Sequence, residues 1–318
     1  MLRWMFASCV LGFALAWAWA DDSLPRGLPE ITLPQASPAM IQLGKQLFSE
    51  TRLSGDGTVS CATCHDALKN FATHDARAIG IGKQMGRRNA PSLMNRALGT
   101  SLFWDGRVKT LEEQALLPIA DPTEMGNTVE KALANLAADA EYPKHFRDAF
   151  GSEGITKERL ASALAAFQRS LLLGNSPVDA FVDGDTAKLS ESAKQGLWLF
   201  ESRANCWKCH SGKNYSDEKF HNTGITWGGT PVDLGRYEVT KKEEDRGRFK
   251  TPSLRGVAKT APYMHDGSIK TLEEVIAYYS KGGNTNTHLD PALKPLNLTE
   301  REQADLLAFL KALSEEVK

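Results

Sequence analysis

Cysteine is scarce in this chain of 318 residues: there are five, and four of them fall in two short motifs. The remaining one, Cys9, lies in an N-terminal segment that we expect to be removed. No cysteine is then left over for a disulfide, so other interactions must hold the fold together. An excess of charge is also missing, because 38 Lys and Arg stand against 39 Asp and Glu. This balance argues against nucleic acid as a partner.

Long apolar runs are missing beyond the first twenty residues. The leading segment has a positive charge at Arg3, an apolar stretch over residues 10–20 and a small-x-small sequence before Asp21. This is the pattern of a signal peptide. The alternative is an uncleaved membrane anchor, but the run is short for a span. We expect cleavage after Ala20, export, and no stable membrane insertion of the mature chain.

The two cysteine motifs have the same form, Cys-x-x-Cys-His, at residues 61–65 and 206–210. Two thiols at this spacing can each add to one vinyl group of a haem, and the histidine is then held under the iron. A thioredoxin-like pair or half of a zinc site needs no such histidine. The sequence predicts two haem c groups in an exported chain, which indicates the periplasm. The predicted attachment and ligand residues are Cys61, Cys64 and His65, and Cys206, Cys209 and His210.

The sequence repeats itself around these two motifs. A helix is predicted shortly before each, over residues 38–48 and 190–200. Pro-Ser-Leu recurs downstream, and thirteen residues after each proline come Trp104-Asp105-Gly106 and His265-Asp266-Gly267. Lys-Thr-Leu-Glu-Glu then follows in both halves. Such collinear similarity indicates an internal duplication.

Each Thr-Leu-Glu-Glu is also a capping box, in which Thr110 or Thr271 caps a helix and the glutamate three residues later reaches back. Chain length allows two domains. We predict a mainly α fold with two cytochrome c-like haem domains related by the duplication. Further helices are predicted at residues 130–136, 157–172 and 299–313. The predicted divisions are a signal peptide at 1–20, an N-terminal peroxidatic haem domain at 21–175 and a C-terminal electron-transfer haem domain at 176–318.

The repeat predicts that the two irons are unequal. Fourteen residues after the head of each Asp-Gly turn stand Pro118 and Tyr279. Tyrosine is a known haem ligand, whereas the side chain of proline cannot ligate. We therefore expect a second haem closed by His210 and Tyr279, and a first haem that is open above His65. Tyr279 could also be an ordinary helix tyrosine, and Tyr278 is a competitor that faces about 100° away.

Both haem motifs, the turn at 103–107, the segment 261–267 and the helix to Tyr279 resemble the bacterial di-haem cytochrome c peroxidase and MauG superfamily. The resemblance covers nearly all of the expected mature chain. In that superfamily conventional peroxidases place methionine over the high-potential haem, and MauG-like enzymes place tyrosine there. Tyr279 is therefore similar to the MauG-like branch, and Met264, in the turn, is interpreted as packing.

The resemblance also implies catalytic residues. The peroxide pocket of the superfamily carries a glutamine, a glutamate and, in MauG, a proline, and Gln114, Glu124 and Pro118 stand at the corresponding offsets. Trp104 would lie between the haems. Many conventional peroxidases carry a distal histidine in the loop before this tryptophan. The loop lacks one here, and His74 is the nearest alternative.

An inter-haem calcium site is implied as well. In the superfamily it uses one asparagine and two backbone carbonyls, and Asn89, Thr260 and Pro262 stand at the corresponding positions. A set of oxygen ligands suits a hard cation. From composition alone, Asn89 could be an ordinary loop residue.

One position departs from MauG, which oxidises its protein substrate through a surface tryptophan two residues before the second haem motif. This chain has Ala204 there. Trp207 or Trp198 could substitute, although either could be a packing residue. The substrate and product of MauG are therefore not carried over. His221 and His288 are interpreted as structural, with His221 the better candidate to border the second haem.

We expect hydrogen peroxide to react at the first haem, with Glu124 and Gln114 moving a proton between its oxygens. Trp104 would share the oxidising equivalents with the second haem. Three hypotheses follow: MauG-like oxidation of a protein partner, a cytochrome c peroxidase supplied by a small cytochrome or cupredoxin, and a non-catalytic di-haem electron carrier. The third requires that both irons be six-coordinate.

Overall fold

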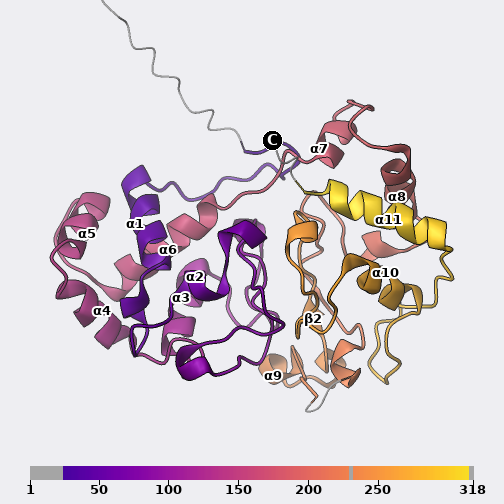
Figure 1. Cartoon of the computed structure of the whole chain (residues 1–318). Helices are drawn as coiled ribbons and strands as arrows, with labels where there is room; N and C mark the ends of the chain where they lie inside the picture. Colours follow the sequence, from indigo (N-terminus) through magenta and orange to yellow (C-terminus); the bar gives the residue numbers. More distant parts are fainter. Residues whose placement is uncertain (1–23, 229–231, 315–318) are drawn as a thin grey trace, which may run out of the picture.

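The computed structural model describes residues 24–228 and 232–314, so the expected signal peptide and Cys9 lie outside the described residues. The described chain is mainly helical, as predicted (Figure 1). One short antiparallel pair, β1 (Phe220–His221) and β2 (Phe249–Lys250), lies in the second half. The α-helices are α1 (Pro38–Phe48), α2 (Cys61–Cys64), α3 (Leu111–Ala120), α4 (Val129–Ala137), α5 (Tyr142–Phe150), α6 (Lys157–Ser170), α7 (Pro177–Val182), α8 (Glu191–Glu201), α9 (Tyr237–Thr240), α10 (Leu272–Ser280) and α11 (Glu300–Ala312).

Two large hydrophobic clusters lie in the two halves of the chain. The first runs from Leu43 to Leu171 and the second from Val178 to Leu313. Figure 1 shows α1 to α6 on one side of the molecule and α8, α10 and α11 on the other. The division at residue 175 stays a prediction, and it falls between the two clusters.

The duplication is visible in the way that helices cross. In the first half α1 packs on α6, and in the second half α8 packs on α11. Each crossing has a glycine at its centre, Gly44 and Gly196. A Cβ atom on Gly44 would lie 1.9 Å from the carbonyl oxygen of Ala163, and one on Gly196 would lie 2.0 Å from that of Asp305. Both backbones therefore approach so closely that only glycine fits.

Gly196→Ala should lower the free energy of unfolding by about 1–2 kcal/mol. A methyl group forced into a packed contact costs about 1–3 kcal/mol, here at the upper end because it meets a backbone oxygen, and the helix preference of alanine returns roughly 1 kcal/mol. Thermal unfolding of the haem-loaded protein measures the effect. Gln195→Ala, exposed on the same helix, is the control and should be near neutral. Wild-type stability in Gly196→Ala would contradict this account of the crossing.

The repeated turns have the same backbone. Gly106 and Gly267 both have φ of 66°, a left-handed conformation that glycine adopts at no steric cost. Thr110 and Thr271 then cap α3 and α10, as predicted. The capping box is complete only at Thr271, because Glu113 accepts instead from the backbone N–H of Lys109 at 3.4 Å. The duplication thus extends from sequence to turn geometry, with one hydrogen bond rearranged.

Four α-helices were not predicted, the short α2 and α9 and the longer α5 and α7. Both α5 and α7 have proline in the first turn, at Pro143 and Pro177. Proline is tolerated there because the first backbone N–H groups of a helix have no partner within it.

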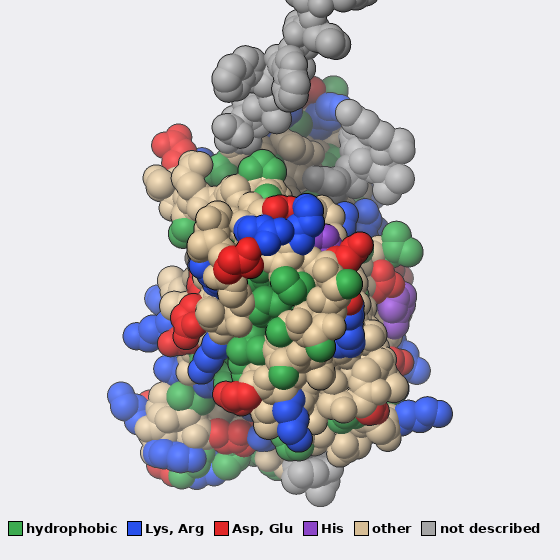
Figure 2. Space-filling model, turned by 90° about the vertical axis from the view of Figure 1, so that its left-hand side faces the viewer, with side chains coloured by type: hydrophobic (Ala, Val, Ile, Leu, Met, Phe, Trp, Pro, Cys, Tyr) green, Lys and Arg blue, Asp and Glu red, His purple; other side chains and the backbone are tan. Residues whose placement is uncertain are grey.

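The described part of the chain contains no helix that is both long and apolar enough to cross a bilayer. On the face shown in Figure 2, charged side chains of both signs are interspersed around hydrophobic ones.

Candidate haem sites

The first Cys-x-x-Cys-His motif forms α2, a single turn of helix, with His65 directly after it. The Nδ1–H of His65 donates to the carbonyl oxygen of Phe71 at 2.8 Å, which fixes the orientation of the ring. Burial lowers the pKa of His65 and keeps the ring neutral. A neutral imidazole, oriented through its other nitrogen, is what an iron ligand requires.

The surroundings of this motif are apolar and aromatic. Phe48 lies 5.2 Å from Phe167 and 5.8 Å from Phe71, measured between ring centroids, and it also faces His65. Burial raises the pKa of Cys61 to about 12 and that of Cys64 to about 11. A reactive redox pair or a zinc site needs thiolates, so the environment argues against both alternatives. An apolar wall beside two thiols and a histidine suits a covalent haem.

Glu124 lies close to the first motif. Its charge contributes to the raised pKa of both Cys61 and Cys64. Burial raises the pKa of Glu124 itself, the charge of Asp121 adds to this, and Arg107 opposes it. The predicted catalytic glutamate is therefore a partly buried carboxyl group beside the first haem motif, with a higher pKa than an ordinary glutamate.

The other two predicted residues of the peroxide pocket lie on α3. Gln114 approaches Gln168 of α6, with 3.5 Å between Gln114 Oε1 and Gln168 Nε2. Pro118 is inside the helix, two residues before its end. Helix α3 packs on α6 and leads directly into the turn that carries Glu124. Gln114, Pro118 and Glu124 therefore lie on one continuous segment, formed by α3 and the turn after it.

The second motif repeats the construction of the first. The Nδ1–H of His210 donates to the carbonyl oxygen of Tyr215 at 3.1 Å, and burial lowers its pKa. Tyr215 and Phe71, the two accepting residues, both have positive φ. Here the cysteines lie on a short 3-10 helix, Cys206–Lys208, in place of an α-turn. The histidine is held by the same kind of contact in both halves.

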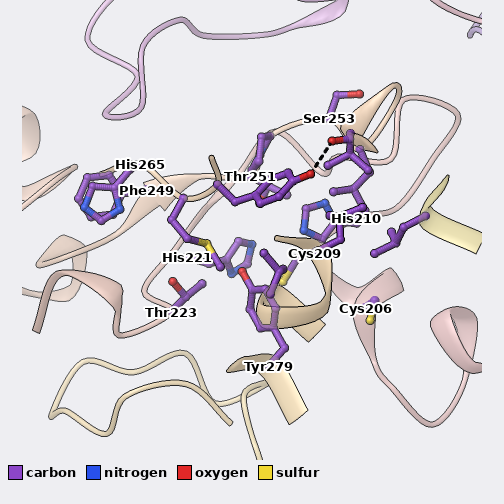
Figure 3. A pocket seen from close by; sticks show the side chains of 18 of the residues that line it. Cys206, Cys209, His210, His221, Thr223, Phe249, Thr251, Ser253, His265 and Tyr279 are labelled. Carbon is purple, nitrogen blue, oxygen red and sulfur yellow. Dashed lines mark hydrogen bonds between the residues drawn. The ribbon is translucent and has the colours of Figure 1, made fainter. Parts of the chain in front are cut away.

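A cavity of about 290 Å³ adjoins this motif. Cys206, Cys209, His210 and Tyr279 all line it, and Figure 3 shows Tyr279 pointing from α10 toward the side of Cys209. Burial raises the pKa of the Tyr279 phenol. A bound cation reverses such an effect, so a ferric iron would favour the phenolate.

Tyr278 and Met264 are the neighbouring alternatives to Tyr279 as a ligand at the second site. The hydroxyl of Tyr278 donates to the carbonyl oxygen of Thr223 at 2.7 Å, and Tyr278 is not among the described residues that line the cavity. Its ring is turned by 80° from that of Tyr279. Met264 also lines the cavity. Several side chains of ligating type therefore line this cavity, and among them Tyr279 stands on the duplicated helix.

His221 borders the second site. The sulfur of Cys209 and the carboxylates of Asp290 and Asp217 raise the pKa of His221 to about 10. Its Nδ1 lies 2.6 Å from Asp290 and its Nε2 lies 2.9 Å from Asp217. A thioether sulfur carries no charge, so after haem attachment the two carboxylates remain as partners. His288 instead lies near Trp227, at 6.4 Å between ring centroids.

Trp104 lies at the cavity of the second motif. Its indole N–H donates to the carbonyl oxygen of Asn89 at 2.9 Å, and its ring lies 6.4 Å from that of His265. His265 stacks on Phe249 at 3.5 Å. Trp104 and His265 both line the cavity of the second motif. The duplicated turns thus bring their aromatic head residues together.

The residues of the expected calcium site also meet at this cavity. Asn89, Thr260 and Pro262 all line it. The side-chain amide nitrogen of Asn89 donates to the carbonyl oxygen of Ala76 at 3.1 Å, so its amide oxygen is not used in this hydrogen bond. In residues 24–228 and 232–314, no three His, Cys, Asp or Glu side chains gather as a metal site. The candidate ligands for calcium are therefore amide and carbonyl oxygens.

Some expected residues lie apart from the sites. His74 pairs with Asp66 and its side chain is 63% exposed, so the structure does not support it as a distal histidine. Trp198 is 59% exposed and Trp207 is 38% exposed, while Ala204 is buried. The ring of Trp207 contacts Tyr215, at 6.3 Å between centroids. Trp207 is therefore part of the second motif and also partly exposed, whereas Trp198 is a surface residue.

Sequence reasoning missed two buried cations. Arg96 and Lys250 line the cavity of the second motif, but each is a single charge in an irregular or very short element. Neither belongs to a motif or to the duplicated pattern. No signal in the sequence separates them from surface charges.

A mainly helical fold with two Cys-x-x-Cys-His motifs defines a di-haem c-type protein. The sequence profile described as di-haem cytochrome c peroxidase matches residues 38–187, and that of cytochrome c matches residues 193–314. The chain belongs to the di-haem cytochrome c peroxidase and MauG family. It is an oxidoreductase that acts on peroxide, with two haem c groups.

Three similar proteins illustrate the range of this family. The methylamine utilization protein MauG of Methylorubrum extorquens is 39% identical, over 92% of this chain and 83% of its own. The cytochrome c551 peroxidase of Nitrosomonas europaea is 36% identical, over 83% of this chain and 79% of its own. A solved MauG-like protein associated with microbial copper homeostasis has a TM-score of 0.86 and 36% identity, and the match covers 94% and 96% of the two chains.

Proposed function

We propose that hydrogen peroxide reacts at an open first haem, attached to Cys61 and Cys64 above His65. His210 and Tyr279 would hold a second haem, with which the oxidising equivalents would be shared. The enzyme then oxidises side chains of a protein partner, as a MauG-like enzyme does.

The difference between two duplicated helices carries this proposal. Pro118 in α3 and Tyr279 in α10 each stand seven residues after the first residue of their helix. Their turns, caps and preceding histidine contacts have matching geometry, so the helices should cover the two haems in the same way. Tyr279 presents a ligating oxygen and Pro118 does not. One haem would then be closed and the other open.

The roles of the side chains follow from their surroundings. A haem iron supplies the site where peroxide binds and its O–O bond is cleaved. Glu124 takes a proton from the near oxygen of peroxide and returns it to the far one, which is general acid–base catalysis. Gln114 orients peroxide through its amide. Trp104, hydrogen-bonded to the backbone of Asn89, lies on the route between the sites.

Two further parts of the proposal concern the environment of the protein. The first part is a calcium ion, which would be bound by the side chain of Asn89 and by the backbone carbonyl oxygens of Thr260 and Pro262. The ammonium group of Lys69 contacts the carbonyl oxygen of Ala261 between them, so its charge would oppose calcium there. The enzyme would act in the periplasm after removal of residues 1–20, and the mass of the purified chain tests that cleavage.

A second candidate function is that of a cytochrome c peroxidase. It removes peroxide with electrons from a small cytochrome or cupredoxin, and relatives named cytochrome-c peroxidase support it. The electron carrier hypothesis has less support, because these relatives are named as enzymes. Steady-state turnover with reduced cytochrome separates the candidates: rapid turnover favours the peroxidase, and slow turnover favours oxidation of a partner protein.

Electron paramagnetic resonance of the resting ferric protein tests the proposed pair of sites. We expect one high-spin signal from the first haem and one low-spin signal from the second, and peroxide should remove both. Chelation with EGTA before the measurement should alter the reaction with peroxide if calcium lies between the haems. Two low-spin signals, with no high-spin component, would reject the open site and support an electron carrier.

A further inference from the structure

Two of the cations that line the cavity beside the second haem motif have no acid of their own. Arg255 at this cavity is paired with Asp179 through two hydrogen bonds of 2.8 and 2.9 Å. His221 lies between two carboxylates, as described above. These two cations therefore have acids of their own. Arg96 and Lys250 do not.

Arg96 and Lys250 share one carboxylate, that of Glu218. The two terminal guanidinium nitrogens of Arg96 each lie 3.3 Å from an oxygen of Glu218, which is long for a hydrogen bond. Lys250 contacts the same carboxylate. Its ammonium nonetheless makes no hydrogen bond of normal geometry with any described residue. The carboxylate of Glu218 thus serves two cations, although the charge of Asp217 also acts on Lys250. Glu218 accepts in addition from the N–H of Thr100 at 3.1 Å.

Both cations are shielded from water. The side chain of Lys250 is 5% exposed and that of Arg96 is 13% exposed. Burial lowers the pKa of Lys250 to about 6, to which the charge of Arg96 contributes, and it lowers the pKa of Arg96 to about 10. Buried charges are normally paired. Without a further anion the ammonium of Lys250 would therefore lose its proton near neutral pH, whereas an anion where Arg96 and Lys250 face the cavity would keep it charged.

The chemistry of a haem c supplies such an anion. Its vinyl groups are taken up by the two cysteines of the motif, and its two propionate carboxylates project from the other edge of the ring. Arginine and carboxylate form strong, charge-assisted hydrogen bonds. The cavity extends from Cys206 and Cys209 to Arg96 and Lys250. It thus offers sulfur at one part of its wall and two cations at another.

We propose that Arg96 and Lys250 form a carboxylate site that binds a propionate of the second haem. The proposal rests on the proposed function in one respect, that the second haem occupies this cavity. Arg96 belongs to the first half of the chain and Lys250 to β2 of the second. The propionate therefore ties the two halves together next to Trp104, whose carbonyl oxygen accepts from the N–H of Lys250 at 2.8 Å.

Reduction potentials of the two haems, measured by spectroelectrochemical titration, test this site. A cation near a haem favours the reduced state, so Lys250→Gln and Arg96→Gln should lower the potential of the second haem. We expect at least a tenfold change in its reduction equilibrium, which is about 59 mV for one electron. Glu218→Gln removes the competing acid and should raise the same potential. Lys219→Gln, an exposed cation beside Glu218, is the control and should change neither haem.

The opposite signs separate charge from structural damage, since damage to the Arg96–Glu218 contact would move the potential in one direction in all three variants. If Lys250→Gln fails to fold, Glu218→Gln and Lys250→Arg still decide, because the arginine should restore the wild-type potential. An unchanged second haem, or a shift confined to the first haem, would overturn the site. Haem content and the low-spin signal of the wild type are measured first. Absence of a haem from Cys206 and Cys209 would instead refute the proposed function.

Discussion

Replacing Glu124 by glutamine should slow the reaction with hydrogen peroxide by roughly a hundredfold to ten-thousandfold, the usual contribution of a general acid–base group. Glutamine keeps the shape of the side chain but cannot take up the peroxide proton. The burial of Glu124 and its closeness to the first haem motif place the effect at that site. Stopped-flow spectra of the ferric protein, mixed with peroxide, measure the rate.

Glu130→Gln is the matched control, since Glu130 is an exposed glutamate at the start of α4. It should react at the wild-type rate. Haem content and the resting spectra of both variants should equal those of the wild type, so that only the reaction with peroxide differs. A wild-type rate in Glu124→Gln would remove the carboxylate from the mechanism.

The pH dependence follows from the same carboxyl group. Glu124 must be ionised to take up a proton, so the rate should fall as the pH falls through its pKa. Burial and the charge of Asp121 raise this pKa, while Arg107 opposes them. Asp121→Asn should therefore shift the loss of activity to lower pH, and Arg107→Gln should shift it to higher pH. Shifts in the same direction would show that another group controls the profile.

Replacing Tyr279 by phenylalanine should raise the reduction potential of the second haem by roughly 0.1 V or more, since axial ligands move haem potentials over about 0.8 V. A phenolate favours the ferric iron, and phenylalanine cannot replace it. Oxidation of a protein partner should be lost, while binding of peroxide at the first haem should persist. Potentiometric titration and the low-spin resonance signal measure the change.

Tyr278→Phe is the control for this variant. Tyr278 is the adjacent residue on the same helix, and its hydroxyl is engaged by the carbonyl oxygen of Thr223. Its loss should leave both haem signals unchanged. Met264 lines the same cavity and could enter the coordination of Tyr279→Phe, so the double variant with Met264→Leu should show an open second haem. An unchanged second haem in Tyr279→Phe would exclude tyrosine as its ligand.

The sequence by itself determined the repeating parts of this protein. The two Cys-x-x-Cys-His motifs need fixed local spacing, so the chemistry of attachment can be predicted without a fold. The amphipathic patterns predicted α1, α8 and α11 closely, and the threonine caps of α3 and α10 are local features too. Family resemblance, rather than periodicity, suggested Glu124 and the calcium ligands. Their roles stay predictions.

Tertiary structure alone decided how distant side chains are paired. It placed Glu124 beside Cys64, turned His74 to the surface with Asp66, and brought Trp104 against His265. It also gave Arg96 and Lys250 one acid between them, with 154 residues separating the two cations in sequence. Local spacing cannot specify such contacts, because the burial and charge of a side chain depend on the segments packed around it. The reactivity of the two haem sites depends on that packing.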